Sequence, residues 1–186
     1  MSLHWLIAVL MVFLLVFGED LIDQENGIQL GPTLHVSLGI AILALTVVRL
    51  AWRMVNPPPA YPAGMAWWEK LAAKITHLLF YVLLIVIPIS GWLAIPGFLE
   101  DEYIGENLSI FGLFPLLIAP NIDPSMDDVH ELTSNITIVL LLMHVLAALK
   151  HHFINRDDVL RRILPRRKPC SDTVTARRSQ GEHSPY

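Results

Sequence analysis

Thiol chemistry is almost absent from this chain. Its 186 residues include a single cysteine, Cys170, so no disulfide can form within the chain. No C-x-x-C-H motif occurs, which excludes the covalent attachment of a c-type haem. Internal repeats are also absent. The fold therefore depends on packing and not on covalent cross-links.

Charged residues are scarce as well. They make up 16% of the chain, whereas hydrophobic residues make up 54%. This balance is typical of membrane proteins, in which a spanning helix needs about 20 apolar residues. Four apolar segments predict such helices, at residues 3–18, 33–53, 69–95 and 127–152. We therefore expect an all-α fold, an integral membrane four-helix bundle, in a single domain of residues 1–165.

Two of these helices allow a more detailed prediction. The first lacks the basic leader and the small-residue cleavage site of a signal peptide, so we expect it to be retained. The third contains Pro88 and Gly91, which should kink it or loosen its last turns.

Lysine and arginine are missing from the loop between the first two helices and from the loop between the last two. These loops and the adjoining helix ends instead hold 12 of the 17 acids: Glu19, Asp20, Asp23, Glu25, Glu100, Asp101, Glu102, Glu106, Asp123, Asp127, Asp128 and Glu131. All 13 Lys and Arg fall on the opposite side. Because cytoplasmic segments carry the excess of Lys and Arg, we expect the N- and C-termini to be cytoplasmic.

Two segments outside the helices are distinctive. Residues 166–186 form a basic, polar tail, for which we predict disorder and contact with anionic lipid headgroups. The apolar stretch Ile110–Pro120 is too short to span a membrane and is interrupted by Pro115. We expect it at the membrane interface or packed on the outer helix ends. Lipid is thus an expected partner, and we expect no nucleic acid.

Histidines carry the functional signal. His130 and His144 are 14 residues apart on one predicted helix, which places them on nearly one face, about 21 Å apart. With the termini inside, His35 matches His130 in depth near the outer side, and His4 matches His144 near the inner side. Polar residues within membrane helices are costly, so a functional role is the default interpretation. Each layer offers two imidazoles, which suit the two axial positions of a b-type haem better than a zinc site.

The surroundings of these histidines fit a haem too. Gly39 lies one turn below His35 and would let a flat macrocycle approach the backbone. Arg49 and Arg53 are cations that could pair with propionates at the inner edge. His77 is a rival to His4 for the inner layer. A role in ordinary polar packing remains the alternative for any single histidine.

Short motifs surround the histidines: LHWL at His4, LHVSLGI at His35, THLLFYVLLIVIPISG at His77, VHELTSN at His130 and LLMHVLAALKHHF at His144. FGLFP follows in the outer loop and NRDDVLRRILP near the end. Together, over about Leu3 to Pro165, they resemble the bacterial cytochrome b561 family. That family also includes the cytochrome b subunits of nickel-iron hydrogenases and formate dehydrogenases.

The resemblance implies a bacterial inner-membrane protein of the respiratory chain with two b haems. His35 and His130 would bind the outer haem, and His4 and His144 the inner one. The pattern is most similar to the short stand-alone members, one of which is a superoxide oxidase that passes electrons to ubiquinone. It therefore implies electron exchange between the quinone pool and a periplasmic-side redox partner or small molecule.

A quinone site is the least defined expectation. The resemblance makes His151 a candidate, because those short members have a histidine pair just past the last ligand. His77 is a second titratable candidate at the inner edge, and Trp68 could pack against a quinone ring. The ordinary alternative is that His151 and Trp68 are interfacial side chains.

The acidic outer side departs from what a superoxide oxidase needs, because it would repel an anion. It would suit a cationic partner such as a basic soluble cytochrome, or it could simply enforce topology. Two other functions stay open beside a stand-alone oxidoreductase. One is a membrane-anchoring cytochrome b subunit of a larger dehydrogenase or hydrogenase, and the other is a haem-free transporter or metal carrier.

Overall fold

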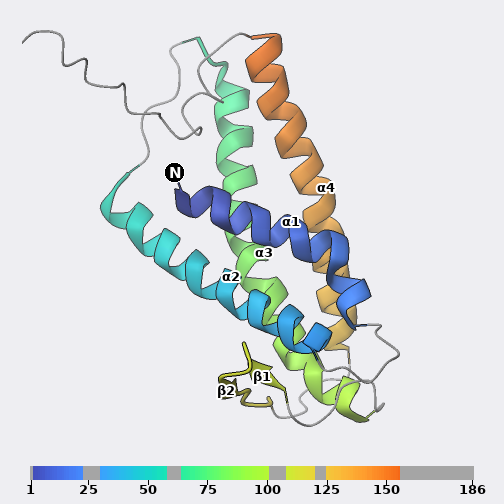
Figure 1. Ribbon diagram of the computed structural model, residues 1–186. Helices are drawn as coiled ribbons and strands as arrows, with labels where there is room; N and C mark the ends of the chain where they lie inside the picture. Colours follow the sequence, from blue (N-terminus) through green and yellow to red (C-terminus); the bar gives the residue numbers. More distant parts are fainter. Residues whose placement is uncertain (1, 23–29, 58–63, 101–107, 120–124, 156–186) are drawn as a thin grey trace, which may run out of the picture.

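Four long helices dominate the computed structural model, which describes residues 2–22, 30–57, 64–100, 108–119 and 125–155 (Figure 1). They are α1 (Ser2–Ile22), α2 (Leu30–Val55), α3 (Trp67–Glu100) and α4 (Met126–Phe153), with two short strands, β1 (Ser109–Ile110) and β2 (Phe114–Pro115). All four helices are long and apolar enough to cross a membrane. The expected tail, residues 166–186, lies outside the described residues.

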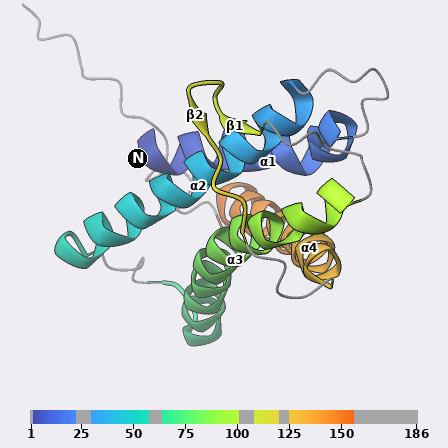
Figure 2. The same cartoon turned by 90° about the horizontal axis from the view of Figure 1, so that it is seen from below.

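The helices form two groups. α3 and α4 lie side by side, and α2 packs on α3 and on α1 (Figures 1 and 2). α1 and α2 run obliquely to the α3–α4 pair (Figure 1). α4 packs mainly against α3, which leaves space between α4 and the two oblique helices.

Prolines lie within α3 without ending it. Pro88 and Pro96 are both inside the helix, which continues to Glu100. Proline removes one backbone donor and crowds the preceding turn. α3 bends in its later, yellow-green part, as both views show (Figures 1 and 2). Within a membrane such a break is tolerated when neighbouring groups satisfy the backbone.

The core lies midway along the bundle. Its buried cluster joins α1, α2 and α3, and consists of Ile7, Met11, Ile42, Leu83, Leu84 and Ile87. By contrast, α4 leaves large apolar side chains exposed, among them Leu142 and Leu146. Lipid tails can cover such a surface, whereas water would not, so the exposed apolar faces fit a membrane-spanning bundle.

A small β-hairpin interrupts the apolar stretch after α3, and the sequence analysis did not predict it. β1 pairs antiparallel with β2, with Ser109 opposite Pro115 and Ile110 opposite Phe114. Phe111 and Gly112 both have positive φ, 51° and 71°, the pattern of a tight hairpin turn.

The hairpin is fastened to two helices. Phe111 N–H donates to the Ser37 hydroxyl of α2 at 2.7 Å, and that hydroxyl donates to the Thr33 carbonyl at 2.6 Å. On α3, the Trp92 indole N–H donates to the Leu117 carbonyl at 2.7 Å. The segment thus packs on α2 and α3 near His35, at what we call the His130 end of the bundle.

Replacing Ser37 with alanine should loosen the hairpin. Ser37 is fully buried, and its loss leaves the Phe111 amide without that acceptor. A lost buried partner costs about 1–3 kcal/mol. Hydrogen exchange followed by mass spectrometry should show faster exchange at Phe111 in Ser37→Ala, with α4 unchanged. Unchanged protection at Phe111 would mean that the hairpin is held by its apolar contacts alone.

Candidate functional site

Histidine rings gather at two levels of the bundle. At the His130 end, the ring centroids of His35 on α2 and His130 on α4 are 6.1 Å apart. Toward the other end, those of His77 on α3 and His144 on α4 are 5.7 Å apart. His4 of α1 joins this second group, since it lines the same cavity. We call the two groups the His130 layer and the His144 layer.

His130 is held by the backbone of α3. Its Nδ1 lies 2.9 Å from the Ile87 carbonyl, to which it can only donate, and 3.5 Å from the Ser90 hydroxyl. A proton on Nδ1 leaves the lone pair of Nε2 free. Metal-ligating histidines are oriented by this kind of second hydrogen bond.

Two glycines make room for the rings of the His130 layer. A Cβ at Gly91 of α3 would lie 2.8 Å from two ring atoms of His130, and one at Gly18 of α1 would lie 3.0 Å from the His35 ring. At Gly91 the His130 ring would have to move, and at Gly18 the His35 ring would have to shift by a few tenths of an ångström. From the sequence, we expected Gly91 only to kink the third helix or loosen its last turns, and we did not single out Gly18. Their only signal was glycine inside an apolar helical pattern.

A cavity of about 360 Å³ opens beside His35 and His130. Gly39, predicted to let a macrocycle approach, lines it, and a Cβ there would meet only Pro88, at 4.0 Å. Apolar side chains of α1, α2 and α3 make most of its wall, and Asp127 and Glu131 of α4 also line it. The cavity therefore combines two imidazoles with a largely apolar interior.

The His144 layer is tighter. Its cavity measures about 80 Å³, and His4, His77, His144 and Arg49 line it. The His144 ring also packs edge-on against Phe80, with centroids 5.3 Å apart. His77 and His144 thus meet across the packed α3–α4 interface, whereas His4 approaches from α1.

The hydrogen bonds of His4 and His77 differ. Nδ1 of His77 lies 2.6 Å from the Ala73 carbonyl, to which it donates, so Nε2 keeps its lone pair. Arg49 Nη1 lies 2.8 Å from Nδ1 of His4. Arginine can only donate, so in this arrangement neutral His4 carries its proton on Nε2. His4 would bind a metal through Nε2 only after Arg49 releases Nδ1.

Arg49 and Arg53 share one aromatic ring. Both guanidiniums lie over Tyr81 of α3, at 5.8 and 5.7 Å from its centroid. In the described part of the chain, the one ion pair joins Lys150 to Glu69. The two arginines are therefore not neutralised by a carboxylate there, and they could receive an anion from the adjacent cavity.

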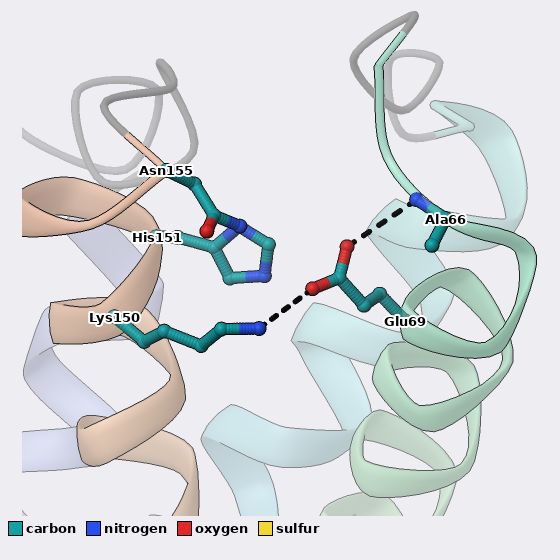
Figure 3. Close-up of polar contacts among 5 residues, drawn as sticks. All are labelled: Ala66, Glu69, Lys150, His151 and Asn155. Atoms are coloured by element: carbon teal, nitrogen blue, oxygen red, sulfur yellow. Dashed lines mark hydrogen bonds and ion pairs between the residues drawn. The ribbon is translucent and has the colours of Figure 1, made fainter.

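The candidate quinone residues do not share one cavity. His77 lines the His144-layer cavity, but Trp68 and His151 do not. Lys150 Nζ lies 5.2 Å from the Trp68 ring centroid. The same ammonium donates to Glu69 at 2.8 Å, and His151 follows Lys150 on α4 beside this pair (Figure 3). His151 is buried, and Asn155 approaches its Nδ1 at 3.3 Å.

These features fit a haem held by two imidazoles. Imidazoles that bind one metal ion from opposite sides at about 2 Å place their ring centres roughly 6 Å apart. The His35–His130 separation is 6.1 Å. Gly39 leaves the cavity wall open beside them. Within the described ranges no three His, Cys, Asp or Glu side chains converge as a metal-binding group.

The comparison with known families decides the assignment. Residues 1–166 match the family described as prokaryotic cytochrome b561. The chain belongs to this family. Members are membrane electron-transfer proteins, and membership implies haem b and a multi-pass location in the bacterial inner membrane.

Curated relatives of this cytochrome b561 match over most of their length. Cytochrome b561 homolog 2 of Escherichia coli is 32% identical over 170 residues, covering 88% of this chain and 87% of that protein. Cytochrome b562 of Cereibacter sphaeroides is 29% identical, covering 88% and 90%. Probable superoxide oxidase CybB of Yersinia pestis is 29% identical, covering 90% and 94%.

Gly91→Ala should lower the haem b content of the purified cytochrome. The new Cβ would collide with the His130 ring and displace it from the cavity. Gly64→Ala is the matched control, because a Cβ there meets nothing within 4 Å. A pyridine haemochrome assay measures both. Equal haem content in the two variants would show that the His130 ring position is not needed for haem binding.

Proposed function

We propose that this cytochrome b561 holds two b haems and carries electrons across the membrane between the quinone pool and a redox partner on the periplasmic side. Its N- and C-termini would be cytoplasmic. The observation that carries the proposal is the His35–His130 pair, whose ring centroids are 6.1 Å apart, together with a second group of histidines around His144 at another level of the same bundle. Bound haem would supply one-electron oxidation and reduction at each level.

His35 and His130 are the proposed ligands of the outer haem. They belong to α2 and α4, two helices that do not pack closely on each other, so a flat group can lie between them. The His130–Ile87 hydrogen bond holds one imidazole through Nδ1 and leaves its Nε2 available to the iron. Gly18 and Gly91 give both rings their space.

His4 and His144 are the proposed ligands of the inner haem. The same packing argument supports them, because α1 and α4 leave space between them, whereas His77 and His144 face each other across the close α3–α4 interface. The Arg49–His4 hydrogen bond favours His77 instead. A haem in this layer would therefore require Arg49 to exchange His4 for another acceptor.

That other acceptor is a haem propionate in our proposal. Arg49 and Arg53 lie together over Tyr81 without a carboxylate partner among the described residues. Guanidinium–carboxylate pairs are strong and geometrically specific. Arg49 would turn from His4 to a propionate, which frees Nδ1 of His4 and allows its Nε2 to face the iron.

The charge distribution supports the proposed orientation. Arg49, Arg53, Lys70, Lys74 and Lys150 all lie toward the ends of their helices that hold the His144 layer. Asp127, Asp128 and Glu131 lie at the opposite end, on the first turns of α4. By the positive-inside rule the His144 end is cytoplasmic and the His130 end periplasmic.

Quinone exchange is proposed for the His144 end. His151 is a buried side chain beside the Glu69–Lys150 pair (Figure 3). The Trp68 ring lies against Lys150. A quinone takes up protons as well as electrons, and a histidine near the inner aqueous phase can hold and pass a proton. His77 would be the titratable group on the haem side.

The ligand proposal predicts which variants lose which haem. The wild type should contain two haems per chain by pyridine haemochrome assay. His130→Ala should retain the inner haem and lose the outer one, and His144→Ala should do the reverse, because each removes one axial ligand. Reduced-minus-oxidised spectra would distinguish the two. A wild type with clearly fewer than two haems would overturn the di-haem proposal.

The choice between His4 and His77 can be tested in the same way. His4→Ala should remove the inner haem, whereas His77→Ala should leave the haem content unchanged. If only His77→Ala removes it, the inner ligand pair is His77 and His144, as the hydrogen bonds alone would suggest.

His151→Ala should slow haem reduction by ubiquinol at least severalfold in stopped-flow experiments, because it removes the buried proton-accepting group. His152→Ala is the matched control from the adjacent position, where the ring packs on Phe153. If both variants are reduced as fast as the wild type, the quinone site lies elsewhere.

Two other functions predict different outcomes. A haem-free transporter or metal carrier predicts no haem absorbance in the purified protein. A membrane-anchoring subunit predicts a stable complex with a large soluble dehydrogenase or hydrogenase subunit on purification. The similarity to probable superoxide oxidase CybB suggests superoxide:ubiquinone oxidoreductase activity as a further candidate, which the acidic outer side opposes. Side-by-side reduction by superoxide and by quinol tests it.

A further inference from the structure

Two carboxylates belong to the wall of the His130-layer cavity. Asp127 and Glu131 both line it, and they lie four residues apart on α4, on either side of His130 in the sequence. Residues at this spacing share one face of a helix. Both side chains are exposed, so they stand where a solute would enter from the aqueous phase.

No cation lines this cavity within the described part of the chain. The cavity of the His144 layer has the opposite character, because Arg49 lines it and none of the described carboxylates does. The two ends of the proposed electron path therefore present opposite charges. The charge bias that indicates the membrane topology lies in the loops and at the helix ends, whereas this contrast concerns the residues that line the two cavities.

Charges around the mouth of an apolar cavity act on approaching ions. A cleft lined by one sign of charge focuses the field and changes association rates by about 10–10³-fold. Exposed charges are screened over about 8–10 Å at ordinary salt concentrations, so the effect is local and depends on ionic strength. Asp127 and Glu131 would attract a cation and repel an anion at the proposed outer haem.

We propose that Asp127 and Glu131 select the electron donor of the His130 layer by charge, so that the donor is a cationic one-electron reductant and anions such as superoxide are disfavoured. The inference rests on the proposed function, because it assumes a haem held by His35 and His130. The reaction transfers one electron: the donor is oxidised by one unit, and the ferric iron becomes ferrous. No proton or group is transferred.

The test uses two reductants of opposite charge. Hexaammineruthenium(II) is a cation, and the sulfur dioxide radical anion formed from dithionite is an anion. Each is mixed by stopped flow with haem-loaded proteoliposomes that expose the His130 end, at low and at high ionic strength. Added salt should slow reduction by the cation and accelerate reduction by the anion.

The variants locate the effect. In Asp127→Asn/Glu131→Gln the ratio of the cation rate to the anion rate should fall roughly tenfold at low salt. Any change in haem potential would move both rates in the same direction, whereas a change in charge selection moves them in opposite directions. Asp128→Asn is the matched control, because Asp128 is an exposed neighbour that does not line the cavity.

The outcomes separate this inference from the proposed function. A purified wild type without haem would refute the function before any rate is measured. With haem present, a wild-type salt response of the same sign for both reductants overturns the charge selection. So does a rate ratio that falls as much in Asp128→Asn as in the double variant. If the double variant binds no haem, the wild-type salt response and the single variants decide.

Discussion

The structure depends on holding pairs of imidazoles about 6 Å apart inside a bundle that is otherwise packed. For His35 and His130 the separation between the ring centroids is 6.1 Å. It is maintained here from behind each ring, where Gly18 and Gly91 let backbone approach and the Ile87 carbonyl fixes His130. The rings are positioned by the scaffold, so they need no partner to hold them apart.

Each of the two histidine layers contains a residue of α4, His130 in one and His144 in the other, so this helix is common to both. α4 packs mainly on α3, while α1 and α2 cross this pair at an angle (Figures 1 and 2). A flat group can lie only where two helices are not in close contact. The proposed ligand pairs accordingly join α4 to α2 and α4 to α1, and α3 serves as support, supplying Gly91, Ile87 and Tyr81.

The sequence predicted the coarse arrangement, because hydropathy and charge act over whole helices. Four spans were expected, and the depth argument put His35 at the level of His130, where the structure brings their rings to 6.1 Å. The close contacts between individual side chains could not be predicted from the sequence. Gly18 is needed because the His35 ring of another helix lies against it. The Arg49–His4 hydrogen bond likewise joins residues that are 45 positions apart in the sequence.

The hairpin was also missed, and for a related reason. Strands of two residues have no detectable period, so the sequence of Ile110–Pro120 indicated only an apolar stretch. What fixes the hairpin is one hydroxyl, Ser37, on a distant helix, together with the indole of Trp92. Such contacts depend on how the helices pack against one another, and the hydropathy pattern of the sequence does not reveal that packing.

Met11 connects the two cavities. It lies in the buried core and lines the cavities of both layers, so one unbranched thioether forms part of two walls. Methionine adapts its shape easily, but packed interiors transmit volume changes to their neighbours. Filling one cavity would therefore alter the space available in the other, so the two haems of the proposed function would load in a coupled way, in which the order of loading matters.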